Sequence, residues 1–433
     1  MGYYPKRGQD TLRFAEYVSD DPARPADVMA VAARVRLLTD PTQQSLIWFL
    51  AGLSSRAGGW ARVSDQLVRM FPGLFDPERT PRYLATFCVN PEIELKRVYF
   101  KADKPAALLE FQRRHREQTL ARIVKTEVAQ RALDTLEFGL ELGRMVLIQG
   151  APGIGKTTAA QTWCEANAGN ARFVSLSGTL NRTTFFQALA RALGLPAAST
   201  TPPAVLQTRI EDVLHACPLL ICFDEAQHLW VKPERNRSTP ELLEWVNTAL
   251  YNHEVPVALV ASPQFSEGLA AVEELSHWNS DQFKSRLKRF TVLPAPEKKD
   301  VEAVAEHLLP DATEAMRQAA VSFALCTRHP MRALLEARDE ATHLARKSGR
   351  VRFTARDLAE ALRSYCLPSE EAKGRMVNTS PAGRLRQPRR AFAAPLRPGG
   401  SQAAEDTFGA GAPVNRTRLS GPELVTPELA ALG

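Results

Sequence analysis

The residues from Gly150 to Thr157 read Gly-Ala-Pro-Gly-Ile-Gly-Lys-Thr and follow an apolar run from Met145 to Ile148. They fit the phosphate-binding loop pattern G-x-x-x-x-G-K-[ST], in which backbone N–H groups turn inward around phosphates. Lys156 then supplies a positive charge for the β- and γ-phosphate oxygens, and the Thr157 hydroxyl can hold Mg²⁺. We therefore expect the chain to bind ATP with Mg²⁺. The expected binding residues are Gly150, Ala151, Pro152, Gly153, Ile154, Gly155, Lys156, Thr157 and Thr158.

A second apolar run ends in two carboxylates, Asp224 and Glu225, about seventy residues after the loop. Asp224 is placed to reach the Mg²⁺ shell, and Glu225 to orient and deprotonate an attacking water. Paired acids after a strand often only solvate its end, but an apolar run in register with a phosphate loop favours the catalytic interpretation. We therefore predict an ATPase with Thr157 and Asp224 as the Mg²⁺ ligands.

Two further positions are candidates for contact with the γ-phosphate. Ser262 ends the apolar run 256–262, and its hydroxyl is suited to bond the γ-phosphate or the attacking water, with Gln264 as the alternative. Either side chain could instead cap the following loop. Arg332, after His329-Pro330, is a candidate to reach the γ-phosphate from the same chain, and Arg328 lies close by in sequence.

Four cations occupy the six residues from Lys284 to Arg289, which we expect just before the last strand of the core. We predict that Arg286 is an arginine finger, a guanidinium that stabilises charge on the transferring phosphoryl group of a neighbouring subunit. The active form would then be an oligomer. For Lys284 and Arg289 we prefer the interpretation of a solvated basic helix end.

The elements that position these residues alternate between apolar strand-like runs and helical stretches. This pattern predicts an α/β fold with a parallel sheet that helices cover on both faces. The expected strands are 144–149, 171–177, 218–225, 256–262 and 289–294.

The regions outside this core are different in character. Three helical segments, 41–54, 60–71 and 77–88, have the layout of a helix-turn-helix module or of a plain helical adaptor. The C-terminal segment contains arginines but no acid between Gly374 and Gly400, and this composition indicates disorder. Its arginines could contact phosphates, or the segment could have no function. The predicted organisation is a helical domain (1–95), a basic linker and helix (96–126), the nucleotide-binding core (127–296), a helical lid (297–367) and a disordered tail (368–433).

The composition of the chain says less about its function than these motifs do. The chain has 433 residues, of which 44% are hydrophobic, and a net charge of +7, which favours a polyanionic partner. No stretch approaches the roughly 18 uninterrupted apolar residues of a membrane helix, so we expect a cytoplasmic protein without membrane contact. Six scattered cysteines lack the spacing of a zinc site and are expected to be reduced.

Taken together, the segments GAPGIGKT, LLICFDEAQHL, VALVASPQF, FKSRLKRF and RHPMRALLEA resemble those of an AAA+ ATPase over about 119–366. Within that superfamily, DEAQHL and a lid helix behind a P-M-R turn are similar to the transposition regulators of the Mu B and TnsC type. The resemblance implies that Ser262 is sensor 1, Arg286 the finger and Arg332 sensor 2. It also implies ATP-driven assembly on double-stranded DNA with little sequence preference, and a transposase as partner.

Three alternatives remain open at this point. An AAA+ replication initiator or helicase loader is also ATP-switched and DNA-bound, but no winged-helix domain follows the lid here. An ATPase of the secretion-associated ExeA type shares a similar DEAQHL segment, but its membrane and peptidoglycan-binding regions have no match. In the third alternative, a signalling switch, the N-terminal helices bind a protein, and nucleotide-dependent retention of DNA would separate it from the others.

Overall fold

The computed structural model describes residues 25–89, 103–178, 180–217, 219–230, 240–275 and 278–365. All of them lie in one compact unit, Met1–Met376. The predicted tail (368–433), Cys366, and residues 96–102 of the predicted linker lie outside the described residues. The helices in this part of the chain are too short or too polar to cross a bilayer.

Five parallel strands form one sheet in the order β2-β3-β4-β1-β5. Their bounds are β1 Met145–Gln149, β2 Ala171–Ser175, β3 Leu220–Asp224, β4 Val257–Ala261 and β5 Leu287–Val292. The predicted fold class is therefore confirmed. The last strand was predicted to begin at Arg289, and this start was wrong, because β5 already begins at Leu287.

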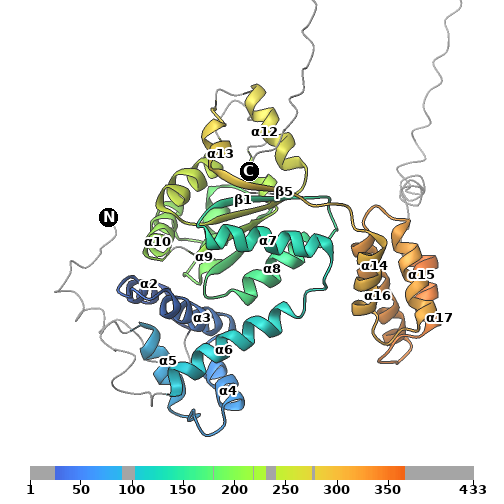
Figure 1. Ribbon diagram of the computed structural model, residues 1–433, viewed down its shortest axis with the longest axis horizontal. Helices are drawn as coiled ribbons and strands as arrows, with labels where there is room; N and C mark the ends of the chain where they lie inside the picture. The colour runs from blue at the N-terminus through green and yellow to red at the C-terminus, as the bar shows by residue number, and fades with distance from the viewer. Residues whose placement is uncertain are drawn as a thin grey trace, which may run out of the picture. The chain divides into compact units, whose positions relative to one another are not determined.

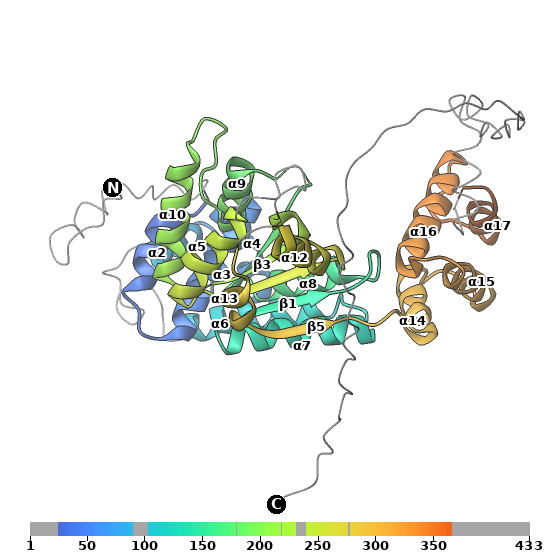
Figure 2. The same ribbon diagram turned by 90° about the horizontal axis from the view of Figure 1, so that it is seen from above.

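Helices cover both faces of this sheet because alternate residues of each strand point to opposite sides. In β1, Val146 and Ile148 pack with α7 (Glu127–Glu141) and α8 (Lys156–Ala166) on one face (Figure 1). Leu147 belongs to the apolar cluster on the other face, together with residues of α9 (Arg182–Leu193), α10 (Pro203–Ala216) and α12 (Gln264–Leu275) (Figure 2).

Four N-terminal helices precede this core, where the sequence predicted three. They are α2 Val28–Arg36, α3 Pro41–Ala57, α4 Trp60–Met70 and α5 Thr80–Val89. Asp40 caps α3 by accepting a hydrogen bond from the N–H of Thr42, Pro41 opens its first turn, and Gly58 ends it with φ 75°. Helix α2 was not predicted, although Asp27 caps it by accepting hydrogen bonds from the N–H groups of Met29 and Ala30.

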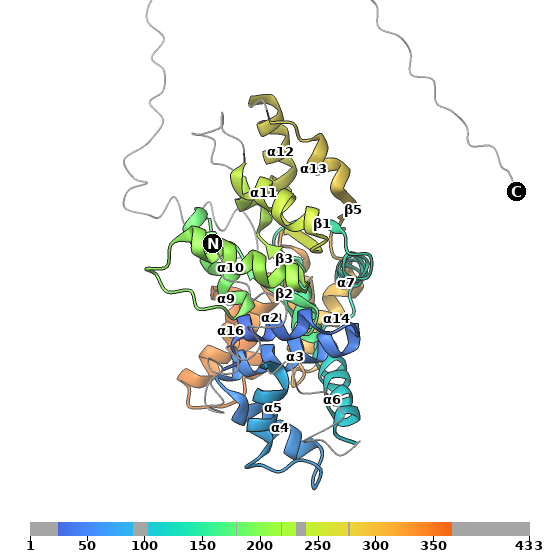
Figure 3. The same ribbon diagram turned by 90° about the vertical axis from the view of Figure 1, so that its left-hand side faces the viewer.

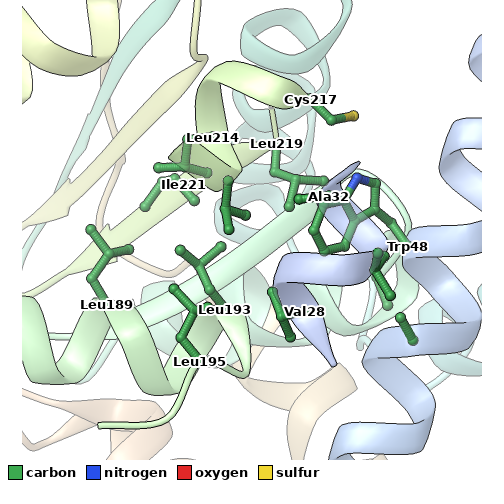
Figure 4. Packing of buried hydrophobic residues seen from close by; sticks show 14 of the residues in the cluster. Val28, Ala32, Trp48, Leu189, Leu193, Leu195, Leu214, Cys217, Leu219 and Ile221 are labelled. Carbon is green, nitrogen blue, oxygen red and sulfur yellow. The ribbon is translucent and has the colours of Figure 1, made fainter. Parts of the chain in front are cut away.

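These N-terminal helices share a hydrophobic cluster with the sheet and its helices. Helix α2 contacts α10, and the two lie side by side with α3 and α9 in Figure 3. Val28 and Trp48 pack in one cluster with Leu193, Leu214 and Ile221 of the core (Figure 4). Arg172 of β2 reinforces this contact, because its buried guanidinium donates to Ala168 O, Ala171 O and Trp48 O.

The predicted basic helix is α6 (Asp103–Leu120), and acids neutralise much of its charge. Glu110 pairs with both Arg113 and Arg114, and Arg116 pairs with Glu137 of α7 at 3.0 Å. Hydrogen bonds from the two arginines lower the pKa of Glu110 to about 2. This supports a solvated helix face over a phosphate-binding one for these residues.

The segment after residue 240 is irregular. It passes from α11 (Glu241–Trp245) through a π-helical turn, η3 (Val246–Leu250), to a 3₁₀ turn, η4 (Tyr251–His253). A further 3₁₀ turn, η1 (Ala226–Leu229), follows β3, and α13 (Asp281–Arg286) leads into β5.

The described residues after β5 form helices and no strand. Their bounds are α14 Lys298–Leu308, α15 Glu314–Leu325, α16 Pro330–Lys347, α17 Ala355–Glu360 and the π-helical turn η5 Ala361–Tyr365. Asp300 of α14 is buried and accepts two backbone hydrogen bonds, from Glu297 N within its own capping box and from Glu127 N at the start of α7, both at 3.0 Å. One carboxylate thus joins α14 to the helix that opens the core.

Candidate functional site

The loop between β1 and α8 has the backbone conformation that phosphate binding needs. Gly153 and Gly155 adopt left-handed φ values of 73° and 99°, which favour glycine. A Cβ on Gly150 would lie 2.8 Å from Ile154 Cδ1, so the loop closes tightly on itself. Thr157 and Thr158 are exposed in the first turn of α8, whose N-terminal N–H groups favour an anion.

Lys156 lies beneath this loop with its Nζ donating to Gly150 O and Ala151 O, both at 2.8 Å. Burial lowers the pKa of Lys156, and the carboxylates of Glu225 and Asp224 partly offset this. The ammonium group is therefore held among carbonyls at the mouth of the loop, where phosphate oxygens would complete its shell.

Asp224 ends β3, only 3% exposed, and accepts a hydrogen bond from the Thr157 hydroxyl. Burial raises the pKa of Asp224, and this hydrogen bond partly offsets the rise. A hydroxyl and a carboxylate from neighbouring elements are the hard oxygen ligands that Mg²⁺ takes from proteins, with phosphate oxygens and water completing the shell. The two predicted ligands thus fit the ion. In the described ranges no larger group of acids, histidines and cysteines could hold a metal by itself.

Glu225 directly follows Asp224 and is exposed, with a left-handed φ of 55°. Such a conformation is costly for a residue with a Cβ and is often found at functional sites. The 3₁₀ turn η1 begins at the next residue. The negative charge of Glu225 acts on Lys156, since it partly offsets the lowering of the Lys156 pKa.

Ser262 follows β4, the strand that lies between β3 and β1. It therefore emerges between the phosphate-binding loop and the Asp224-Glu225 pair, at the carboxyl edge of the sheet. Its Oγ is 3.5 Å from the side-chain oxygen of Gln264, and its N–H donates to Gln227 Oε1 at 3.2 Å. Ser262 has the central position that its predicted role needs.

Arg286 lies at the amino-terminal ends of the strands, opposite the end that carries the phosphate-binding loop. β5 runs parallel to β1, and Leu287 pairs with Met145 at the start of that strand. At roughly 3.3 Å per residue, the length of β1 separates Arg286 from the loop by about 16 Å. Its guanidinium donates to Asn247 O at 2.7 Å and lies 5.3 Å from the Tyr251 ring. Arg286 cannot serve the nucleotide of its own chain.

The neighbouring cations have other contacts. Lys284 pairs with Glu273 at 2.5 Å, and Arg289 lies over the Phe138 ring at 3.8 Å and donates to Asp134 O. Arg289 thus packs on α7 as part of the strand and does not belong to a basic helix end.

Residues at the start of α16 approach the loop. A Cβ on Gly153 would lie 2.9 Å from His329 Cβ and 3.5 Å from Arg332 Cβ. Arg332 is exposed, and its charge lowers the pKa of Lys156 as a minor contribution after burial. The structure therefore places Arg332 beside the phosphate-binding loop.

Two residues near the site had no predicted role. His329 contacts the loop, and its Nδ1 is buried without a hydrogen-bond partner in the described part of the chain. Gln227 bonds both Glu225 and Ser262. The available signal was their place within the RHPMR and DEAQHL segments, but neither residue type is itself diagnostic.

The comparison with protein families agrees with this geometry. A family model described as an AAA domain matches residues 141–269. No curated protein matches the chain. The match and the parallel sheet with its phosphate-binding loop identify an AAA+ P-loop fold with a helical N-terminal region.

Solved structures similar to this chain include two from Aeropyrum pernix: the ADP form of the ORC2 protein (20% identity, TM-score 0.42, 55% of this chain and 66% of that one) and the ORC1 protein in complex with DNA (19%, 0.42, 54% and 63%). The Thermotoga maritima RuvB Holliday junction branch migration motor is also similar (15%, 0.34, 54% and 68%). The chain spans slightly less than two thirds of the length of the two ORC proteins.

Proposed function

We propose that this chain is an ATPase that hydrolyses ATP at the interface between two of its copies and assembles in this way on DNA. The observation that carries the proposal is the separation of Arg286 from the phosphate-binding loop of its own chain. A chain that holds Lys156, Asp224 and Glu225 at one edge of the sheet and the finger candidate at the other completes its site only with a neighbour.

Within one chain, each residue has a separate task. Lys156 and the loop N–H groups bind the β- and γ-phosphates, and Thr157 and Asp224 hold Mg²⁺, which would neutralise charge on these phosphates. Glu225 orients the attacking water and accepts its proton, while the Ser262 hydroxyl and Arg332 contact the γ-phosphate.

ATP bound in this way makes assembly depend on the nucleotide. Its γ-phosphate lies between Lys156 of one copy and Arg286 of the next, so loss of that phosphate on hydrolysis weakens the contact. A ligand that favours one state shifts an equilibrium by its differential affinity for that state. ATP therefore favours the assembled form, and hydrolysis reverses it.

Charge supports DNA as the surface for assembly. The chain has a net charge of +7, and α4 and the turn before α5 expose Arg62, Arg69 and Arg79. Such contacts to phosphates give binding with little sequence preference and strong salt dependence. The resemblance of the DEAQHL and P-M-R segments to transposition regulators extends the proposal: the assembly selects target DNA and recruits or activates a transposase.

Gel shifts and electron microscopy on random-sequence duplex DNA test this proposal. The chain is compared with ATP, with ADP and as Glu225→Gln with ATP, at two salt concentrations, with Lys156→Ala as the variant that should not bind nucleotide. We expect filaments or rings on DNA with ATP that persist in Glu225→Gln and weaken with salt. Nucleotide-dependent changes without retention of DNA would instead indicate a protein-directed switch.

A further inference from the structure

Gln227 lies in the 3₁₀ turn that begins directly after Glu225. The left-handed backbone of Glu225 reverses the chain there, and His228 N donates back to Glu225 O at 2.9 Å. The turn therefore directs the Gln227 side chain toward the residue that precedes it by two positions. The hydrogen bond that Glu225 accepts here comes from this turn and not from the phosphate-binding loop.

The amide of Gln227 forms one hydrogen bond on each side. Its Nε2 donates to Glu225 Oε2, and its Oε1 accepts from Ser262 N at 3.2 Å. Because β3 and β4 are neighbours in the sheet, this single side chain bridges the ends of two strands. The amide suits both contacts, since its NH₂ donates to the carboxylate while its oxygen accepts from the backbone N–H.

The consequence concerns the orientation of Glu225. Its carboxylate is exposed, and an exposed glutamate side chain otherwise samples several rotamers. A general base must be held within hydrogen-bond reach of the water it deprotonates, and misplacement by about 1 Å can cost about 100-fold in rate. The Gln227 amide removes this freedom and fixes Glu225 relative to Ser262.

We propose that Gln227 is a positioning residue that holds Glu225 in place for attack on the γ-phosphate and links it to the Ser262 loop. This inference rests on the proposed hydrolysis of ATP. It assigns no contact between Gln227 and the nucleotide, so nucleotide affinity should not depend on it.

Two substitutions separate the contacts. Gln227→Glu keeps an oxygen for Ser262 N but replaces the donor to Glu225 by a second carboxylate, whereas Gln227→Met removes both hydrogen bonds at similar volume. We expect both to lower kcat by about 10- to 100-fold and to change KM for ATP by less than about threefold. ATP affinity, measured with a fluorescent nucleotide, should remain close to that of the wild type.

The split between kcat and KM is the readout that a purely structural role would not give. Loss of the local fold would weaken ATP binding as well as hydrolysis, whereas a misplaced Glu225 carboxylate lowers kcat and leaves ATP binding intact.

Gln207→Glu is the matched control. Gln207 Nε2 donates to Glu211 Oε1 at 2.8 Å on α10, so the substitution breaks the same type of glutamine–glutamate contact away from the site. It should leave kcat within about twofold of the wild type. If the wild type hydrolyses ATP, Glu225→Gln does not, and both Gln227→Glu and Gln227→Met keep the wild-type kcat, only this inference is wrong. If the wild type binds ATP without hydrolysing it, the proposed function fails as well.

Discussion

Mixing two inactive variants tests whether Arg286 acts on the nucleotide of another copy. Arg286→Ala keeps Lys156 and Glu225 but lacks the finger, and Glu225→Gln keeps the finger but lacks the base. Alone, Arg286→Ala should lose hydrolysis by about 10³-fold or more, the usual contribution of an arginine finger, and Glu225→Gln by about 10²-fold or more, the usual contribution of a general base. Nucleotide binding should survive in both.

The recovery expected on mixing follows from the placement of the two sites at opposite edges of the sheet. In a head-to-tail assembly each interface takes its loop from one copy and Arg286 from the next. In an equimolar random mixture, the copy that supplies the loop has an intact Glu225 with a probability of about one half. The next copy has an intact Arg286 with the same probability. About a quarter of the interfaces, and so about a quarter of the wild-type rate, should therefore return.

Steady-state release of phosphate, measured across mixing ratios at constant total protein, gives the result. Arg289→Ala is the matched control, because Arg289 packs on Phe138 of its own chain and should not affect hydrolysis in this way. Activity that stays at the level of the separate variants at every ratio would refute the assignment of Arg286 as a finger in trans. Loss of hydrolysis in Arg289→Ala with an active Arg286→Ala would show that the other arginine has the role.

Three further substitutions test other contacts. Asp300→Asn should lower the free energy of unfolding in urea by about 2 kcal/mol, because one of the two part-buried N–H groups that the carboxylate accepts from would then face an amide NH₂. A loss below about 0.5 kcal/mol would contradict this. Gly268→Ala places a Cβ 2.7 Å from Trp230 Cδ1, and an overpacking cost of about 2 kcal/mol should exceed the gain of about 1 kcal/mol in helix propensity, so a higher melting temperature would refute the contact. Burial raises the pKa of Asp224, so the charged carboxylate destabilises the nucleotide-free fold at neutral pH. Asp224→Asn should therefore raise the melting temperature at neutral pH. This gain should vanish at acid pH, where Asp224 is protonated in the folded wild type. A gain that is equal at both pH values would rule out that explanation.

The sequence predicted the sheet better than its surroundings. Strands β1, β3 and β4 are buried along their whole length, so their apolar runs are continuous and easy to recognise. β5 is an edge strand that alternates half-buried and exposed residues. Its first residues, Leu287 and Lys288, were placed in the basic segment before the strand, and Arg289 was interpreted as a solvated helix end although it began the predicted strand. Periodicity gives an edge strand a weaker signal than a central one, and the start of β5 was misplaced for this reason.

The site could be predicted where a motif fixes residue types and not where contacts depend on tertiary structure. The glycines and Lys156 are recognisable because the backbone conformation and charge that phosphates need admit few alternatives. Gln227 has no such constraint in sequence, and its two hydrogen bonds exist only because β3 and β4 are neighbours. The π-helical turn at 246–250 also gives no local signal, although it supplies the carbonyl that holds Arg286.

The apolar cluster shared by α2, α3 and the sheet limits how this protein can be dissected genetically. Removing the N-terminal helices would uncover Leu193, Leu214 and Ile221, which are buried, and would leave the Arg172 guanidinium without one of its carbonyl acceptors. A truncated chain would then lose activity through aggregation even if those helices never touch a partner. Point substitutions on their exposed faces are therefore the informative alleles, and a deletion phenotype would report on folding.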